Sequence, residues 1–356
     1  MRIGDARAAA ADWVARHASL EAGFKGAYYS GSTVGKPDDA ELPASSDVDV
    51  VVVLDGPEPP LKLGKFVYRG TLIEITYLSW EQIGSAEDVL ASYHLAGSFR
   101  ADTIIADPTG QLRGVQTQVA RGFAEEAWVR RRCENARQRI ENGLRGFDAS
   151  APWHDQVTSW LFPAGVTTHV LLVAALRNPT VRLRYLAARE VLAEYGHGGL
   201  YPELLALLGC ATWTPERTAR HVDGLARTFD AAAAAAKTPF FFCSDITAAA
   251  RPIAIDGSFA LIRAGDHREA VFWIVATFAR CHKILAADAP DLEAALAPAF
   301  DAVLADLGIA GTEDLARRAE AVARFLPRLR DAADAILLAN PEILRQPRFD
   351  QERSPS

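Results

Sequence analysis

A run of valines behind two aspartates is the stretch that most constrains the fold of this chain. Asp47 and Asp49 are separated by Val48, and residues 50–54 are then uniformly apolar. Such a run is typical of a buried strand. Because successive side chains point to opposite faces of a strand, the two aspartates share one face and Val48 lies on the other. The carboxylates are therefore predicted to lie side by side at the edge of a buried apolar strand.

A turn of small residues comes shortly before this strand. Residues 24–29 form a short predicted strand that leads into Gly31 and Ser32. A missing Cβ beside a small hydroxyl would let backbone N–H groups approach phosphate oxygens, although the pair alone is typical of an ordinary turn. Two adjacent carboxylates can share Mg²⁺, which phosphoryl and nucleotidyl transfer use to neutralise phosphate charge. The two features together indicate metal-dependent chemistry on a nucleoside triphosphate.

The chain resembles the polymerase-β-like nucleotidyltransferase superfamily through the combination of Gly31-Ser32, a polar spacer and Asp47-x-Asp49 ahead of a valine run. The resemblance is closest to its antibiotic nucleotidyltransferases, such as those that modify aminoglycosides, and covers roughly the first 110 residues. It implies a third carboxylate on a later strand, for which Glu74 is the candidate. By this resemblance Asp47, Asp49 and Glu74 hold Mg²⁺. The resemblance also implies that Gly31 and Ser32 grip the terminal phosphates of ATP or another NTP.

Side-chain alternation along the later strand supports this place for Glu74. In the predicted strand 71–78, Ile73 and Ile75 share one face, and Glu74 lies on the other face with Thr76. A carboxylate that faced the apolar core would be costly. Glu74 is therefore expected to face the cleft, beside the aspartates.

The implied reaction moves a nucleoside monophosphate, expected to be AMP, from a triphosphate to a hydroxyl of a small-molecule acceptor, and releases pyrophosphate. One metal ion would sit on the triphosphate, and a second, shared with Glu74, would lower the pKa of the acceptor hydroxyl. The general base stays open between Glu74 and a carboxylate of the later part of the chain. Two alternatives also stay open: a nucleotide-binding regulatory protein with this fold and no catalysis, and a transferase that acts on a protein.

The spacer 33–46 is long and carries three further carboxylates, on Asp38, Asp39 and Glu41. These groups could attract a polycationic acceptor of the aminoglycoside kind. An exposed polar loop is the favoured interpretation.

The composition of the chain changes at about Gln111, where strand-like runs give way to alanine, leucine and arginine. We therefore expect an α+β fold with three segments: a nucleotidyltransferase domain over 1–113 with a mixed sheet and flanking helices, a helical domain over 114–345 that closes over the nucleotide and binds the acceptor, and a disordered tail over 346–356. One long helix is predicted over 115–144. Pro298 and Pro327 are each expected to kink or break a helix.

Composition also bounds the partners and the compartment. The formal net charge of −7 over 356 residues argues against a nucleic-acid binder, whose surface is normally basic. The four cysteines form no C-x-x-C pair, which fits a reducing cytoplasm. Membrane insertion is not expected, since a helix that spans a bilayer requires ~20 predominantly apolar residues.

Overall fold

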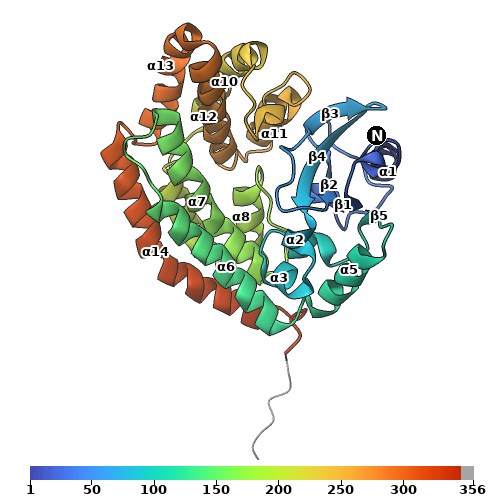
Figure 1. The fold of residues 1–356 in the computed structure, drawn as a ribbon. Helices are drawn as coiled ribbons and strands as arrows, with labels where there is room; N and C mark the ends of the chain where they lie inside the picture. Colours follow the sequence, from blue (N-terminus) through green and yellow to red (C-terminus); the bar gives the residue numbers. More distant parts are fainter. Residues whose placement is uncertain (346–356) are drawn as a thin grey trace, which may run out of the picture.

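Five strands form one mixed sheet in the computed structural model, which describes residues 1–345 (Figure 1). In chain order the strands are β1 (Phe24–Ser30), β2 (Val48–Leu54), β3 (Gly64–Tyr68), β4 (Thr71–Ser79) and β5 (Ile104–Ala106). Their spatial order is β3-β4-β2-β1-β5, with β2 and β4 parallel and the other neighbours antiparallel. The predicted α+β fold with a mixed N-terminal sheet is confirmed at this level.

The central place of β2 explains its unbroken apolar run, because both faces of this strand are covered. Val48 and Val50 pack toward helix α1 (Ile3–Arg16), whose Trp13 and Val14 share the same core. The next residue on the other face, Val51, packs against a second layer of helices. That layer consists of α2 (Trp80–Ile83), α3 (Ala86–Ala91), α4 (Ala96–Phe99) and α5 (Gln111–Gly122). The strand therefore alternates as predicted, with a core on each side.

Strands β3 and β4 form a hairpin around a two-residue turn. Arg69 and Gly70 both have positive φ, 49° and 77°, as turns that match the twist of a hairpin require. The tight turn fixes the register, which places Lys65 opposite Glu74. A lysine and a carboxylate are thus paired across the hairpin by local geometry.

The predicted single helix over 115–144 is wrong, because the chain breaks at residues 123–125 between α5 and α6 (Glu126–Arg145). Glu125 has an extended backbone at the break. The chain near its C-terminal end is hydrogen-bonded there: Leu344 N–H donates to Ala124 O over 2.8 Å, and Glu126 N–H donates to Leu344 O over 3.0 Å. A long-range contact therefore takes up the backbone groups that a continuous helix would have used.

Helices make up the rest of the described chain. After α6 come α7 (Trp153–Ala174), α8 (Arg184–Glu194), α9 (Tyr201–Leu208), α10 (Pro215–Ala235), α11 (Gly257–Arg263), α12 (Val271–Asp288), α13 (Pro290–Asp306) and α14 (Thr312–Ala339). Helices α7 and α12 are the most buried and lie at the centre of this part. Pro298 and Pro327 lie inside α13 and α14, and neither breaks its helix.

Helix α7 alone, among the described helices, is long and apolar enough to cross a membrane. Of its most apolar 18-residue window, 78% is buried inside the protein. Because α6, α12 and α14 already cover it, its apolar surface belongs to the core.

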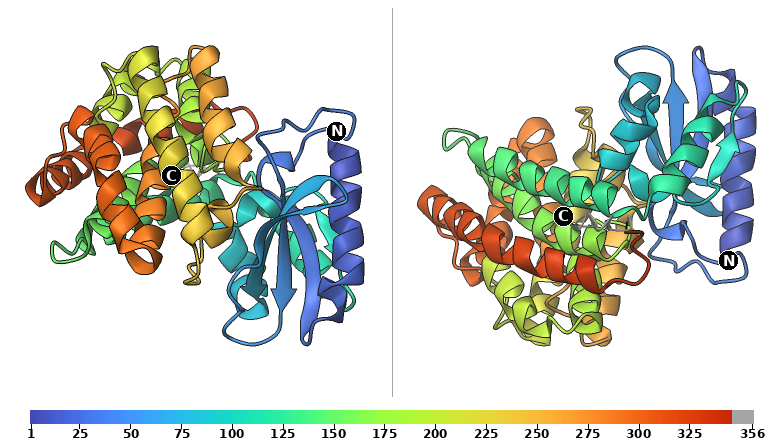
Figure 2. Two further views of the ribbon diagram at one scale, coloured as in Figure 1. Left: turned by 90° about the horizontal axis from the view of Figure 1, so that it is seen from above. Right: turned by 90° about the horizontal axis from the view of Figure 1, so that it is seen from below.

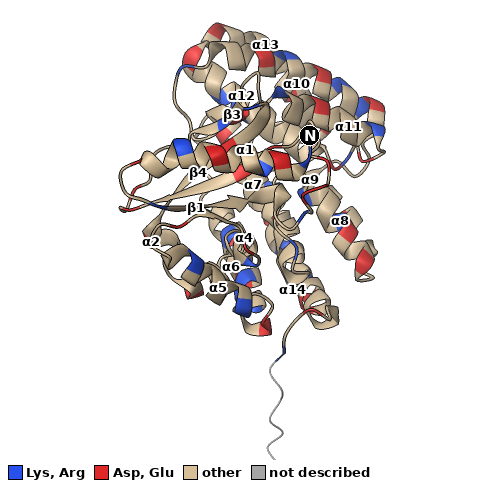
Figure 3. Ribbon diagram, turned by 90° about the vertical axis from the view of Figure 1, so that its right-hand side faces the viewer, with Lys and Arg blue, Asp and Glu red and all other residues tan. Residues whose placement is uncertain are grey.

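The sheet with its helices and the helical part lie side by side, as Figures 1 and 2 show from three directions. Acidic and basic residues are interspersed on α1 and α10, which is typical of solvated helix faces, whereas the charged residues of α13 are all acidic (Figure 3). The predicted disordered tail, 346–356, lies outside the described residues.

Candidate metal centre between the sheet and the helices

Three carboxylates meet at the N-terminal end of β2 and the adjoining part of β4. Asp47 directly precedes β2, Asp49 is its second residue, and Glu74 lies beside Asp49 in the parallel register. One oxygen from each side chain lies within 4.8 Å of the other two. Within residues 1–345 this is the one group of three or more metal-binding side chains at such spacing. The structure thus brings the three residues together.

Gly31 and Ser32 lie next to this group, in a short 3-10 turn that follows β1. Ser30, the last residue of β1, is paired with Asp49. Gly31 has φ of 66°, and a Cβ there would overlap the Asp49 carboxylate. Ser32 is exposed, and its Oγ lies 3.2 Å from Ser46 Oγ. The glycine is therefore needed to let the turn pass the carboxylate.

Two lysines from β3 and the segment before it neutralise part of the acidic charge. Lys65 Nζ donates to Glu74 Oε2 and lies 3.1 Å from Asp47 Oδ2. Lys62 Nζ donates to the other oxygen, Glu74 Oε1. Neither lysine was identified from the sequence, because the pairing of Lys65 with Glu74 depends on the register of the hairpin.

A fourth carboxylate comes from the helical part. Asp245, in a short 3-10 turn between α10 and α11, has only 10% of its side chain exposed. Its oxygens accept from Lys65 Nζ over 2.9 Å and from Arg280 Nη1, in α12, over 2.9 Å. Nothing in the local sequence marks Asp245, because its partners lie 180 and 35 residues away.

The two parts of the protein are in close contact around this group. Gly64 has φ of 79°, and a Cβ there would overlap the side chain of Ser244. Arg182 Nη2 donates to Ser45 O over 3.2 Å, in the loop that leads into Asp47. The helical part therefore approaches both the lysine strand and the aspartate loop.

Burial and mutual repulsion set the charge states of the carboxylates. Burial raises the pKa of Asp49 well above its usual value, and the neighbouring Asp47 and Glu74 raise it further. Burial also raises the pKa of Asp47, against the attraction of Lys65. Although burial opposes it, the ammonium groups of Lys65 and Lys62 lower the pKa of Glu74. Asp49 thus has the least compensated charge of the three.

The carboxylates of the spacer belong to a different environment. Asp38 Oδ1 accepts from Arg7 Nη1, in α1, over 2.6 Å, and 76% of the Asp38 side chain is exposed. Asp39 and Glu41 are also exposed. The loop is therefore tied to α1 through Asp38, and none of its carboxylates joins the group at β2 and β4.

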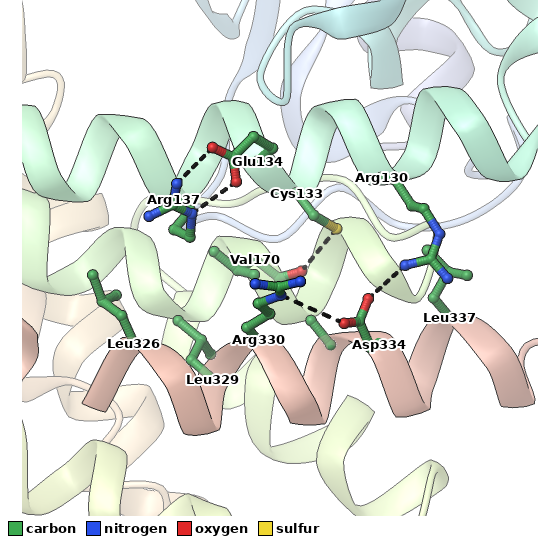
Figure 4. A pocket seen from close by; sticks show the side chains of 11 residues that line it. Arg130, Cys133, Glu134, Arg137, Val170, Leu326, Leu329, Arg330, Asp334 and Leu337 are labelled. Carbon is green, nitrogen blue, oxygen red and sulfur yellow. Dashed lines mark hydrogen bonds and ion pairs between the residues drawn. The ribbon is translucent and has the colours of Figure 1, made fainter. Parts of the chain in front are cut away.

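A cavity of about 290 Å³ lies elsewhere, between α6, α7 and α14 (Figure 4). Its apolar wall includes Val170 and Leu329, and its polar wall carries the ion pairs Arg137–Glu134 and Arg130–Asp334. None of the predicted site residues lines this cavity.

Comparison with protein-family models gives no match for the chain, and none of the curated protein sequences matches it.

Proposed function

We propose that the protein is a Mg²⁺-dependent nucleotidyltransferase, with the sheet and its helices as the nucleotidyltransferase domain. The observation that carries this proposal is the meeting of Asp47, Asp49 and Glu74 on adjacent parallel strands, with ligand oxygens within 4.8 Å of one another. The expected donor is ATP or another NTP. The expected acceptor is a hydroxyl of a small molecule, with an aminoglycoside-like compound as the first class to test.

The residues at this place suit a hard divalent ion. All three ligands are carboxylates, which Mg²⁺ prefers over nitrogen or sulfur donors. The pKa of Asp49 is raised by burial and by its neighbours, so the group is poorly compensated by the protein itself. When bound, Mg²⁺ would neutralise charge on the phosphates and lower the pKa of the acceptor hydroxyl.

Each residue has a distinct role in the proposed reaction. Asp47 and Asp49 would hold the metal, and Glu74 would hold a second ion or accept the proton of the acceptor hydroxyl. The turn at Gly31 and Ser32 lies beside Asp49 and presents small groups to the triphosphate. Arg182, bound to the loop before Asp47, brings a positive charge from the helical part toward the phosphates.

One observation favours a second function, a nucleotide-binding protein without catalysis. Lys62 and Lys65 already donate to both oxygens of Glu74, which leaves this carboxylate less available to a metal or a proton. In that case the sheet would bind nucleotide, and the helical part would serve as a binding module. A transferase that acts on a protein would use the same carboxylates with another acceptor.

The deciding experiment measures pyrophosphate release. The full chain is incubated with Mg²⁺, each of the common NTPs in turn, and panels of aminoglycosides, lincosamides and proteins. We expect release with one NTP and one acceptor class, and none from Asp47→Asn. Binding of NTP with no release for any acceptor would instead support the regulatory function.

We place the activity in the cytoplasm, because all four cysteines are free.

A further inference from the structure

The ammonium of Lys65 is surrounded by carboxylates from both parts of the protein. It contacts Asp47 and Glu74 from the sheet and Asp245 from the helical part. All four of these side chains are only 10–13% exposed. Lys65 therefore serves as the counter-ion of a nearly enclosed acidic group, with two contacts to oxygens of the proposed metal ligands.

A divalent ion on those ligands would lie too near this ammonium for both to keep their places. Lys65 Nζ is 3.1 Å from Asp47 Oδ2. Because Mg²⁺ binds carboxylate oxygens at about 2.1 Å, an ion on that oxygen would lie within about 5 Å of the ammonium. At this separation and burial the two cations repel each other strongly. They also compete for the same oxygens of Asp47 and Glu74.

We infer that Lys65 is the resident counter-ion of the site, and that a divalent cation binds by displacing its ammonium. Lys65 thereby sets the metal affinity. Its departure also breaks the Lys65–Asp245 ion pair, which joins the sheet to the helical part. Metal binding is therefore coupled to loosening of the contact between the two parts. This inference rests on the metal ligands of the proposed function, and goes beyond it by assigning a residue that regulates their occupancy.

The remaining contacts make this exchange feasible. When the ammonium leaves, Asp245 keeps Arg280 at 2.9 Å and Lys62 at 3.7 Å, so its carboxylate stays compensated. Lys65 has a flexible four-carbon stem that can carry its charge toward solvent or toward bound phosphates. The exchange thus leaves no buried charge without a partner.

The test is the binding of Mn²⁺ alone, without nucleotide, to the full chain at low ionic strength, followed through the electron paramagnetic resonance signal of the free ion. We expect Lys65→Gln to bind Mn²⁺ at least ~10-fold more tightly than the wild type, because a competing cation is removed. Lys65→Arg keeps the charge and should stay within about threefold of the wild type. Lys25→Gln is the matched control, since Lys25 pairs with Asp55 at the other end of the strands.

Hydrogen exchange gives a second readout that does not depend on activity. We expect saturating Mn²⁺ to raise amide exchange around Asp245 in the wild type. In Lys65→Gln the same amides should exchange fast without metal. The inference would be overturned if Lys65→Gln bound Mn²⁺ no more tightly than the wild type. It would also be overturned if Mn²⁺ left the exchange of the amides around Asp245 in the wild type unchanged. If neither protein binds Mn²⁺ at millimolar concentration, the proposed metal centre itself fails. If Lys65→Gln binds more tightly but no NTP is turned over, the counter-ion role stands and the transferase does not.

Discussion

Two regions of this molecule contain the same kinds of side chain, carboxylates paired with cations, but differ in how far these side chains are exposed to solvent. At the contact between sheet and helices, Asp245 and Lys65 have 10% of their side chains exposed. Between α6 and α14, Arg130 and Asp334 have 43% and 41% exposed, and their ion pair is 2.6 Å long. The first group is nearly enclosed by protein, whereas the second stands at the wall of an open cavity (Figure 4).

The two regions differ in how much their ion pairs can contribute to the stability of the fold. An exposed pair costs little to form and contributes at most about 1 kcal/mol. Enclosed charges lose several kcal/mol of hydration each, and their attraction seldom exceeds this cost. A fold that only needed to join two parts would be as stable with apolar contacts. On the proposed function, the enclosed carboxylates are present for the chemistry they permit, and four changes test this contrast.

The largest effect is expected from Asp49→Asn. The change removes a ligand charge at constant volume, so pyrophosphate release should fall by ~10³ or more. The urea midpoint measured with EDTA should stay the same or rise, because repulsion from Asp47 and Glu74 is relieved. Near-normal turnover would remove Asp49 from the proposed metal centre.

The next effect is on stability, in Asp245→Asn. The change leaves Arg280, which is buried, without its charged partner. Removal of one member of an enclosed pair should lower the free energy of unfolding by about 3–5 kcal/mol, measured by urea denaturation. A loss below about 0.5 kcal/mol would mean that the contact between the parts behaves like a surface pair.

A smaller loss is expected from Glu74→Gln, in catalysis rather than stability. If Glu74 holds the second ion or takes the proton, the rate should fall by ~10² with little change in NTP affinity. Glu134→Gln, which removes an exposed carboxylate from α6, is the control and should leave the rate unchanged. Equal losses of rate and affinity would instead show that Glu74 positions the nucleotide.

The smallest effect is expected from Asp334→Asn. This change breaks the Arg130–Asp334 ion pair on the exposed side of α6 and α14. The free energy of unfolding should change by no more than about 0.5 kcal/mol, measured under the conditions used for Asp245→Asn. A loss as large as that of Asp245→Asn would remove the contrast between the two regions.

The carboxylates that the sequence identifies are those whose position follows from a local period. Alternation along β2 and β4 predicts that Asp49 and Glu74 point away from the core that holds Val50 and Ile75. In the structure both carboxylates lie on the face opposite to that core. The two residues lie side by side because β2 and β4 pair in parallel. This pairing depends on the tertiary structure and does not follow from the pattern of a single strand. The resemblance implied only that a third carboxylate lies on a later strand, beside the two aspartates.

What could not be predicted depends on contacts between distant segments. Asp245 sits in a short turn with no periodic pattern, and only the packing of the two parts brings it to Lys65. The break before α6 has the same origin, since Leu344 binds the backbone there. Pro327 was expected to disturb its helix, yet α14 continues through it. At the break before α6, a tertiary contact outweighs the local preference for a continuous helix.

The β3–β4 hairpin also determines the order in which the charged residues of the acidic group come together during synthesis. Lys65 and Glu74 are nine residues apart, and a hairpin forms within about 10 μs. Asp245 follows Lys65 by 180 residues, which at about 20 residues per second takes roughly 9 s of synthesis. During that interval the nascent sheet already carries its own cation beside Glu74. In the growing chain, the hairpin can therefore supply a cation for Glu74 before the helical part has been synthesised.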